Sequence, residues 1–202
     1  MNTAFYSYKG GQGVTTTAVL YATDAERIGK RVLIVDHTRS GDAAATMGVS
    51  VPWGYGKNDE PDHPIMVNDN LFLATYTSDF NPDEYDEIVH DFGVLDPDKD
   101  YAKTFYAYRI PAWHQVFVTR SCYLSLRKYA ACNHGGVGQI VLIKELGRAL
   151  TAHDVSRCCD NAPVVEINHD PRVSRMVDAG LLGYKNIGIK LYERINTVNA
   201  VR

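Results

Sequence analysis

The chain has 202 residues, of which 45% are hydrophobic and 22% charged. A chain of this length buries one full core but is short for two, so we expect a single domain over residues 1–202. It contains no run of about 18 apolar residues, which argues against a membrane span. Its first residues lack the charged and apolar regions of a signal peptide, so we expect a cytoplasmic protein.

The net charge of −3 hides an asymmetry between the two halves of the chain. Residues 1–100 contain 7 Lys and Arg against 17 Asp and Glu, a net charge of −10, whereas residues 101–202 contain 14 against 7, a net charge of +7. A basic half can bind a polyanion, because Lys and Arg that neutralise phosphates release counterions. The alternative is a solvated surface with scattered charges.

Strand-like and helix-like segments alternate along the chain. A short apolar strand over residues 2–8 is followed by a glycine-rich turn, a helix over residues 15–28 and a buried strand over residues 31–36. Residues 51–69 are rich in Pro, Gly, Asn and Asp and predict a surface loop.

The later segments repeat this alternation. We expect strands over residues 70–75, 85–91, 114–119, 138–144 and 163–168, and helices over residues 101–108, 121–132, 151–158, 171–179 and 187–198. The pattern predicts an α/β fold with a mostly parallel sheet and helices on both faces. In such folds ligands bind beyond the carboxyl ends of the strands.

The most informative segment is the glycine-rich turn between the first strand and the first helix. It consists of Lys9, Gly10, Gly11, Gln12, Gly13, Val14, Thr15 and Thr16. Glycines let successive backbone N–H groups converge, and a helix amino terminus adds partial positive charge, so the segment predicts a phosphate site. The Thr15 hydroxyl is placed to ligate Mg²⁺. The alternative is an ordinary glycine turn before a helix.

This segment resembles the deviant Walker A loop of the ParA/MinD family of P-loop ATPases, whose pattern is K-G-G-x-G-K-[ST]-[ST]. Six positions match: Lys9, Gly10, Gly11, Gly13, Thr15 and Thr16. Val14 departs from the pattern, because the family has there the lysine that contacts the β- and γ-phosphates. Loss of that charge removes stabilisation of the transition state, so the resemblance implies an ATP-binding protein with weak or no hydrolysis.

The resemblance also assigns roles to individual residues and implies a P-loop NTPase-like three-layer sandwich. Lys9 is similar to the signature lysine that reaches across a nucleotide-bound dimer to the partner's phosphates. Asp36 resembles the aspartate that positions the attacking water and contacts the metal shell, which makes Lys9 and Asp36 the catalytic candidates. Asp91 resembles the Walker B aspartate that binds Mg²⁺ through water. The implied nucleotide contacts are Gly10, Gly11, Gln12, Gly13, Val14, Thr15 and Thr16, and the implied metal contacts are Thr15, Asp36 and Asp91.

The implied function is that of a small ParA-like protein of plasmid, phage or chromosome partition, or of intracellular positioning. ATP and Mg²⁺ would stabilise a homodimer that binds nucleoid DNA through its basic surface until a centromere-binding, ParB-like partner releases it. The first candidates for DNA contact are Arg172, Arg175, Lys185, Lys190 and Arg194.

Two alternatives stay open. Val14 favours a degenerate pseudo-ATPase that works as a dimerising adaptor or regulator. A MinD-like positioning protein would need an amphipathic C-terminal helix, and residues 187–196 are only modestly amphipathic and poor in lysine, so we do not expect a membrane partner.

Overall fold

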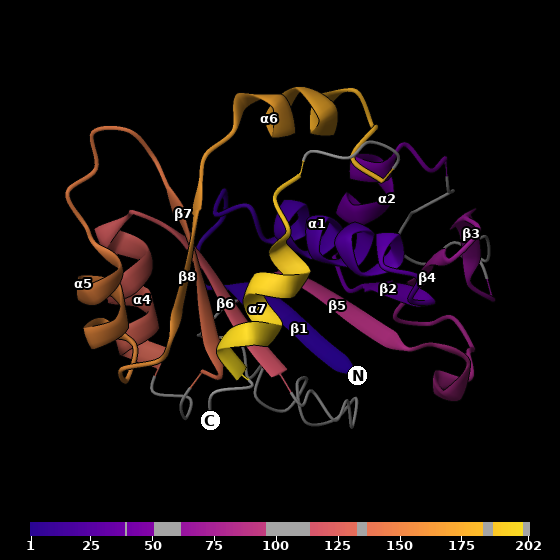
Figure 1. The fold of residues 1–202 in the computed structure, drawn as a ribbon, viewed down its shortest axis with the longest axis horizontal. Coiled ribbons are helices and arrows are strands. Elements are labelled where there is room, and N and C mark those ends of the chain that lie inside the picture. Colours follow the sequence, from indigo (N-terminus) through magenta and orange to yellow (C-terminus); the bar gives the residue numbers. More distant parts are fainter. Residues whose placement is uncertain (39, 51–61, 96–113, 133–136, 184–187, 200–202) are drawn as a thin grey trace.

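The structure is a computed structural model that describes residues 1–38, 40–50, 62–95, 114–132, 137–183 and 188–199. Its centre is an eight-stranded sheet in the order β3-β4-β2-β5-β1-β6-β7-β8 (Figure 1). The pairing of β3 with β4 is antiparallel, and the other described pairs are parallel. The strands are β1 (Asn2–Ser7), β2 (Val32–Asp36), β3 (Ile65–Asn68), β4 (Leu71–Thr75), β5 (Glu87–Val94), β6 (His114–Arg120), β7 (Gln139–Lys144) and β8 (Val164–Asn168).

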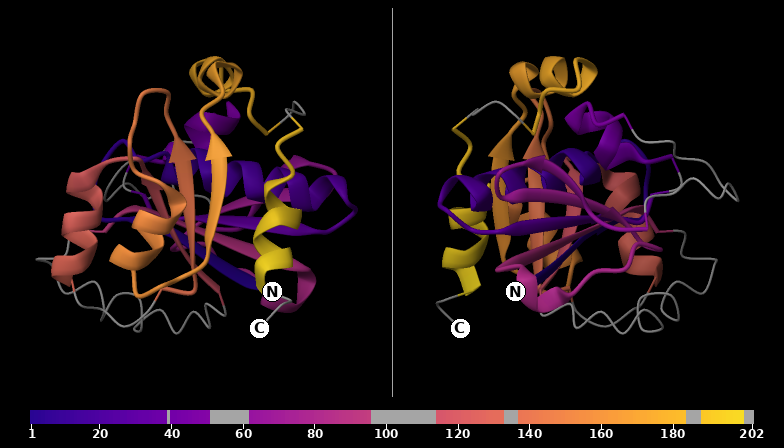
Figure 2. Two further views of the ribbon diagram at one scale, coloured as in Figure 1. Left: turned by 60° about the vertical axis from the view of Figure 1, so that its left-hand side comes forward. Right: turned by 90° about the vertical axis from the view of Figure 1, so that its right-hand side faces the viewer.

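Helices cover both faces of this sheet (Figure 2). One face carries α1 (Val14–Arg27) and α7 (Leu191–Asn199), and the other carries α4 (Tyr123–Cys132) and α5 (Ala152–Cys158). Two further helices, α2 (Asp42–Met47) and α6 (Pro171–Asp178), lie toward the carboxyl ends of the strands. The predicted three-layer α/β fold with a mostly parallel sheet is therefore confirmed. No helix among the described residues is both long and apolar enough to cross a membrane.

The core consists of two large clusters, one on each face of the sheet. Phe5, Ile34 and Val89 pack beneath α1, whereas Phe117 and Leu142 pack beneath α4 and α5. The central strands are buried on both faces, which explains their nearly continuous apolar sequences.

The predicted surface loop over residues 51–69 is wrong in its last part, where residues 65–68 form the edge strand β3. The hairpin to β4 is closed by the Asn68 side chain, which accepts hydrogen bonds from the N–H groups of Asn70 and Leu71. The strand is short and partly exposed, and the Pro, Gly, Asn and Asp residues around it give the segment the composition of a loop. Residues 51–61 lie outside the described residues.

Several other boundaries differ from the prediction. The strand β5 begins two residues later than predicted and continues three residues past Asp91, and α7 begins at Leu191. The helix α2 and a 3₁₀ turn, η1 (Pro82–Glu84), were not predicted. The helix predicted over residues 101–108 lies outside the described residues.

Candidate functional site

The glycine-rich turn lies at the topological switch point of the sheet, where the order in which strands are added reverses. It follows β1, which is flanked by β5 and β6, so it stands beside the carboxyl ends of both neighbours. The backbone N–H of Leu95 donates to the carbonyl of Ser7 at 2.8 Å and fixes the start of the turn. In open α/β sheets such a switch point is where ligands bind.

The amino terminus of α1 is open to an anion. Gly13 is the N-cap in the left-handed region, with φ +83° and ψ 29°, and no side chain caps the helix. The first N–H groups, those of Val14, Thr15 and Thr16, therefore lack intrahelical acceptors. Thr17, by contrast, donates from both its N–H and its hydroxyl to the Gly13 carbonyl, at 2.9 and 2.7 Å. The helix dipole adds to these free donors.

Gln12 fastens the turn to the end of β6. Its Oε1 accepts a hydrogen bond from the Arg120 N–H at 3.0 Å and lies 3.5 Å from the Thr119 hydroxyl, while its Nε2 donates to the Gly10 carbonyl at 3.3 Å. The side chain is buried. Of the predicted nucleotide contacts, Gln12 therefore has its side chain committed to the protein, and only its backbone faces the turn.

Val14 and Lys9, the two residues that decide the charge of the turn, lie in different environments. Val14 is buried and packs into the core cluster beneath α1, so it presents no group to the turn. Lys9 is partly exposed and forms no ion pair with another described residue. Gly10 and Gly11 are exposed beside it. Lys9 is thus the one cation of the turn, and its side chain is partly exposed.

Asp36 and Asp91 stand side by side, because β2 and β5 pair in register at these two residues. Both oxygens of Asp36 are occupied: Oδ1 accepts from the N–H and hydroxyl of Thr38 at 2.8 and 2.6 Å, and Oδ2 accepts from the Ala43 N–H at 2.9 Å. These bonds attach the end of β2 to the first turn of α2. Thr38 was not singled out in the sequence, although Asp-x-Thr after a strand is a turn signal.

Asp91 keeps one oxygen for a ligand. Its Oδ1 accepts from the Gly93 N–H at 3.0 Å, whereas its buried Oδ2 has no hydrogen-bond partner of normal geometry among the described residues. Burial, together with the charge of Asp36, raises the pKa of Asp91 to about 7, and the nearby Thr15 hydroxyl opposes the shift. Burial also raises the pKa of Asp36, against its hydrogen bonds from Thr38 and Ala43.

The orphaned oxygen fits a hydrated divalent cation. Within the described residues, no group of three or more His, Cys, Asp and Glu side chains could hold a metal by itself. Mg²⁺ typically keeps several waters and binds through one or two carboxylates together with substrate phosphates. Asp36 pairs with Asp91 in the sheet and the Thr15 hydroxyl acts on Asp91, so the three predicted metal contacts lie near one another, and a phosphate at the amino terminus of α1 would complete such a shell.

A histidine pair supports the same strand ends from the opposite face. His37 Nε2 and His90 Nδ1 are 3.1 Å apart, and the His37 ring stacks on Phe92 with centroids 4.2 Å apart and planes 9° apart. Burial lowers the pKa of His37 to about 3 and that of His90 to about 4, so both rings are neutral near pH 7. Their effect here is to pack the strand ends.

The candidate cations for a DNA surface are largely engaged locally. Arg172 pairs with Asp170 at 2.6 Å, Lys190 pairs with Glu193 at 3.4 Å, and Arg194 donates to the Glu166 carbonyl. Arg175 is exposed, and Lys185 lies outside the described residues.

The fold matches solved structures of ParA and MinD proteins over nearly its whole length. A ParA family ATPase from Chlorobium tepidum is 16% identical with a TM-score of 0.67, and the alignment covers 98% of each chain. MinD from Pyrococcus horikoshii, solved with Mg-ADP, is 17% identical with a TM-score of 0.71, covering 100% of this chain and 98% of that one. A nucleotide-binding protein from Archaeoglobus fulgidus, solved with ADP, is 18% identical with a TM-score of 0.67, covering 96% and 91%.

At these identities the likeness establishes the shared P-loop NTPase-like fold. No protein-family model and no curated protein matches the sequence.

Proposed function

We propose that this chain is a ParA-like ATP-binding protein of DNA partition or intracellular positioning, and that it acts as a nucleotide-dependent homodimer. One observation carries the proposal: the uncapped amino terminus of α1 contains Thr15, whose hydroxyl acts on the carboxyl group of buried Asp91, and the Oδ2 of that carboxyl group has no other hydrogen-bond partner among the described residues. An arrangement of free donors next to an unpaired carboxylate suits a phosphate and its cation together. The fold shared with nucleotide-bound MinD supports it.

In this proposal the backbone of the turn holds the phosphates and the side chains hold the cation. The N–H groups from Gly11 to Thr16 bind phosphate oxygens, and Thr15 and Asp91 hold Mg²⁺, Asp91 through water. The ion neutralises phosphate charge when bound. Asp36 is committed to Thr38 and Ala43, so it positions α2 next to the nucleotide.

Hydrolysis is slow or absent in this proposal. Val14 lies in the core, where the family pattern has a lysine at the phosphates, and phosphoryl transfer depends chiefly on electrostatic stabilisation of the developing charge. Lys9 reaches the phosphates bound by the partner of the dimer and restores part of this charge. The buried Val14 equally favours the pseudo-ATPase adaptor, which binds ATP and dimerises without turnover.

Calorimetry tests whether the chain binds ATP, and light scattering tests whether ATP makes it dimerise. Titration with ATP and Mg²⁺ should give one site per chain and should convert monomer to dimer. Lys9→Ala should abolish the dimer and keep the fold, whereas Lys30→Ala, three residues past the carboxyl end of α1, serves as the matched control. Absence of adenine-nucleotide binding at millimolar ligand would reject the proposal, and a Lys9→Ala protein that dimerises like wild type would reject the role of Lys9.

Measurements of ATP turnover and of DNA binding distinguish a partition protein from a pseudo-ATPase adaptor. Val14→Lys should raise ATP turnover, unless the wild type is already as fast as ordinary family members, in which case our account of Val14 fails. Gel shifts on two unrelated duplexes should show ATP-dependent binding that weakens steeply with salt. If no duplex binds at low salt with ATP present, the adaptor is the better interpretation.

A further inference from the structure

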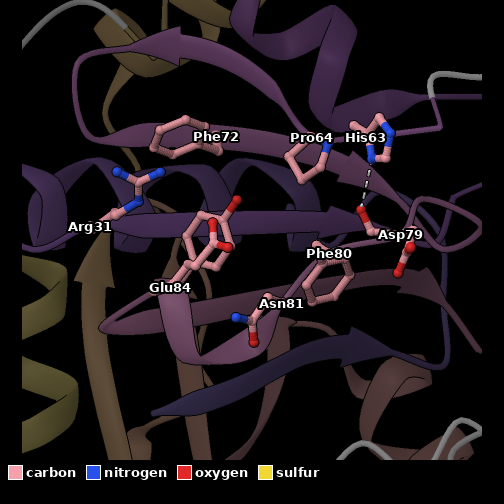
Figure 3. A pocket seen from close by; sticks show the side chains of 9 residues that line it. Arg31, His63, Pro64, Phe72, Asp79, Phe80, Asn81 and Glu84 are labelled. Carbon is pink, nitrogen blue, oxygen red and sulfur yellow. Dashed lines mark hydrogen bonds between the residues drawn. The ribbon is translucent and has the colours of Figure 1, made fainter.

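A pocket lies beside β2 and β4 and is lined by residues of these strands' neighbourhood and of the segment between β4 and β5 (Figure 3). It has a volume of about 520 Å³, and the residues that matter here are Arg31, Phe72, Asp79, Phe80, Glu84 and Tyr85. Arg31 directly precedes β2, whose other end is Asp36, so the Arg31 backbone lies about 16 Å from that aspartate along the strand at ~3.3 Å per residue. Nothing in the proposed nucleotide function uses this pocket.

Three half-buried aromatic rings form the wall of the pocket. Phe72 and Tyr85 meet edge to face, with centroids 5.6 Å apart and planes at 72°. Phe80 and Tyr85 also meet at a steep angle, 81°, with centroids 6.5 Å apart. The rings cover a small core cluster of Leu33, Val35, Ala74 and Ile88 on one side and line the pocket on the other.

One part of this wall already binds a cation. The Arg31 guanidinium lies 4.4 Å from the centroid of Phe72 and 5.5 Å from that of Tyr85. Such contacts are attractive because the ring face is electron-rich. No cation of the described residues lies over Phe80, at the other end of the wall.

Carboxylates lie on both sides of Phe80 (Figure 3). Asp79 lines the pocket on the side away from Arg31 and Glu84 lines it on the side toward Arg31, and three more exposed carboxylates, those of Asp62, Asp83 and Asp86, belong to the same segments. None of the five forms an ion pair with a Lys, Arg or His side chain of the described residues. This local excess of acid matches the net charge of −10 over residues 1–100. The carboxylates disfavour a phosphate or an acidic ligand, and they suit a cation held against an aromatic ring.

We propose that this pocket is a docking site for a basic peptide segment of a partner protein, with an arginine or lysine side chain bound against Phe80 between Asp79 and Glu84. The face of the ring attracts the cation in addition to the carboxylates, whereas a surface ion pair alone contributes little binding free energy. The acidic surroundings speed the encounter with a positively charged segment. The site is separate from the nucleotide turn, so its occupancy does not depend on the proposed ATPase-like role.

Fluorescence anisotropy with a labelled (Gly-Arg)₆ peptide tests the site on the full chain. At physiological ionic strength the peptide should bind saturably, and (Gly-Glu)₆ and (Gly-Ser)₆ should not. Phe80→Leu keeps apolar bulk but removes the ring, and should weaken binding about two- to fivefold. The double variant Asp79→Asn, Glu84→Gln should weaken it about tenfold. Asp69→Asn, an exposed acid at the β3–β4 turn, is the matched control and should change the affinity less than about twofold.

Two readouts keep the test independent of folding and of the nucleotide site. Thermal unfolding should show that each variant is folded, and NMR ring resonances of Phe80 and Tyr85 should shift on titration of the peptide into wild type. ATP affinity should be equal in wild type and Phe80→Leu. Lack of saturable binding, or an equal loss in Phe80→Leu and Asp69→Asn, would overturn the proposal and leave only general attraction to an acidic surface.

Discussion

The contact between Gly48 and Gly180 offers a sharp test of how the fold supports the proposed nucleotide site. Gly48 ends α2 with φ +68°, and Gly180 follows α6 with φ +62°. A Cβ added to Gly48 would lie 2.3 Å from the backbone oxygen of Gly180. Because backbone meets backbone here, no side chain can rotate away, and the Gly48→Ala substitution must push α2 and α6 apart.

The expected cost has two parts. An alanine in the left-handed region costs about 1–2 kcal/mol, and forcing extra volume into a packed contact costs about 1–3 kcal/mol. Gly48→Ala should therefore lower the free energy of unfolding by about 2–5 kcal/mol. Gly29 provides the matched control, because its φ is +86° and nothing lies within 4 Å of the Cβ that Gly29→Ala would add. That control should cost only the conformational part, about 1–2 kcal/mol.

Urea denaturation of both variants gives the two free energies, and ATP titration gives a functional readout. The Ala43 N–H at the start of α2 donates to Asp36, so displacement of α2 should loosen Asp36 and weaken nucleotide binding. Gly29→Ala, at the far end of α1, should leave that affinity unchanged. If Gly48→Ala costs no more than Gly29→Ala, the backbone contact is not a constraint and the reasoning fails.

Three further changes test the buried polar groups. Burial raises the pKa of Glu87 from 4.5 to about 7, so the folded chain keeps a proton that the unfolded chain loses. The free energy of unfolding should then fall by about 3 kcal/mol as pH rises from about 4.5 to 7. Urea titrations at several pH values should show that Glu87→Gln lacks this part of the pH dependence. Parallel plots of unfolding free energy against pH for wild type and variant would contradict the prediction. Gln12→Ala frees the turn from Arg120 and should cost about 1–3 kcal/mol of stability and speed nucleotide release in stopped flow; unchanged release would show that the tether is dispensable. Asp91→Asn removes one of two adjacent buried carboxylates, so Mg²⁺-dependent stabilisation by ATP should shrink in thermal scans, and full retention would exclude Asp91 from the metal shell.

Most strands of the sheet were predictable, because a strand buried on both faces can be recognised from its own residues. Strands buried on both faces show as continuous apolar runs, and β2, β4, β6, β7 and β8 lie within one or two residues of their predicted limits. The missed edge strand β3 has one solvated side and a sequence whose polar neighbours resemble a loop. Short α2 was missed because its start depends on Asp36, a residue outside the helix.

The strand positions of the two aspartates were largely predictable, and their hydrogen bonds were not. Asp36 ends β2 as expected, and Asp91, expected at the end of its strand, lies three residues before the end of β5. The donors around them come from turns whose approach depends on tertiary packing. The basic-peptide pocket had no sequence signal. Arg31, Phe72 and Phe80 come from separate segments with no shared spacing, and only the fold places them on one wall.

Asp36 and Asp91 are equivalent in the sequence, as strand-end aspartates, and the structure gives them different environments. Asp36 has both oxygens satisfied by backbone and hydroxyl donors, so it stabilises the start of α2 without any ligand. Asp91 has a buried oxygen, Oδ2, with no hydrogen-bond partner of normal geometry among the described residues, which costs folding free energy unless a cation offsets it. Val14, in turn, contributes to the core and removes charge from the phosphate turn. Both features support the proposed function: a cation bound with a nucleotide would offset the cost at Asp91, and the loop lacks the lysine charge that would accelerate phosphoryl transfer. We therefore favour a slow nucleotide-controlled switch as the proposed mode of action.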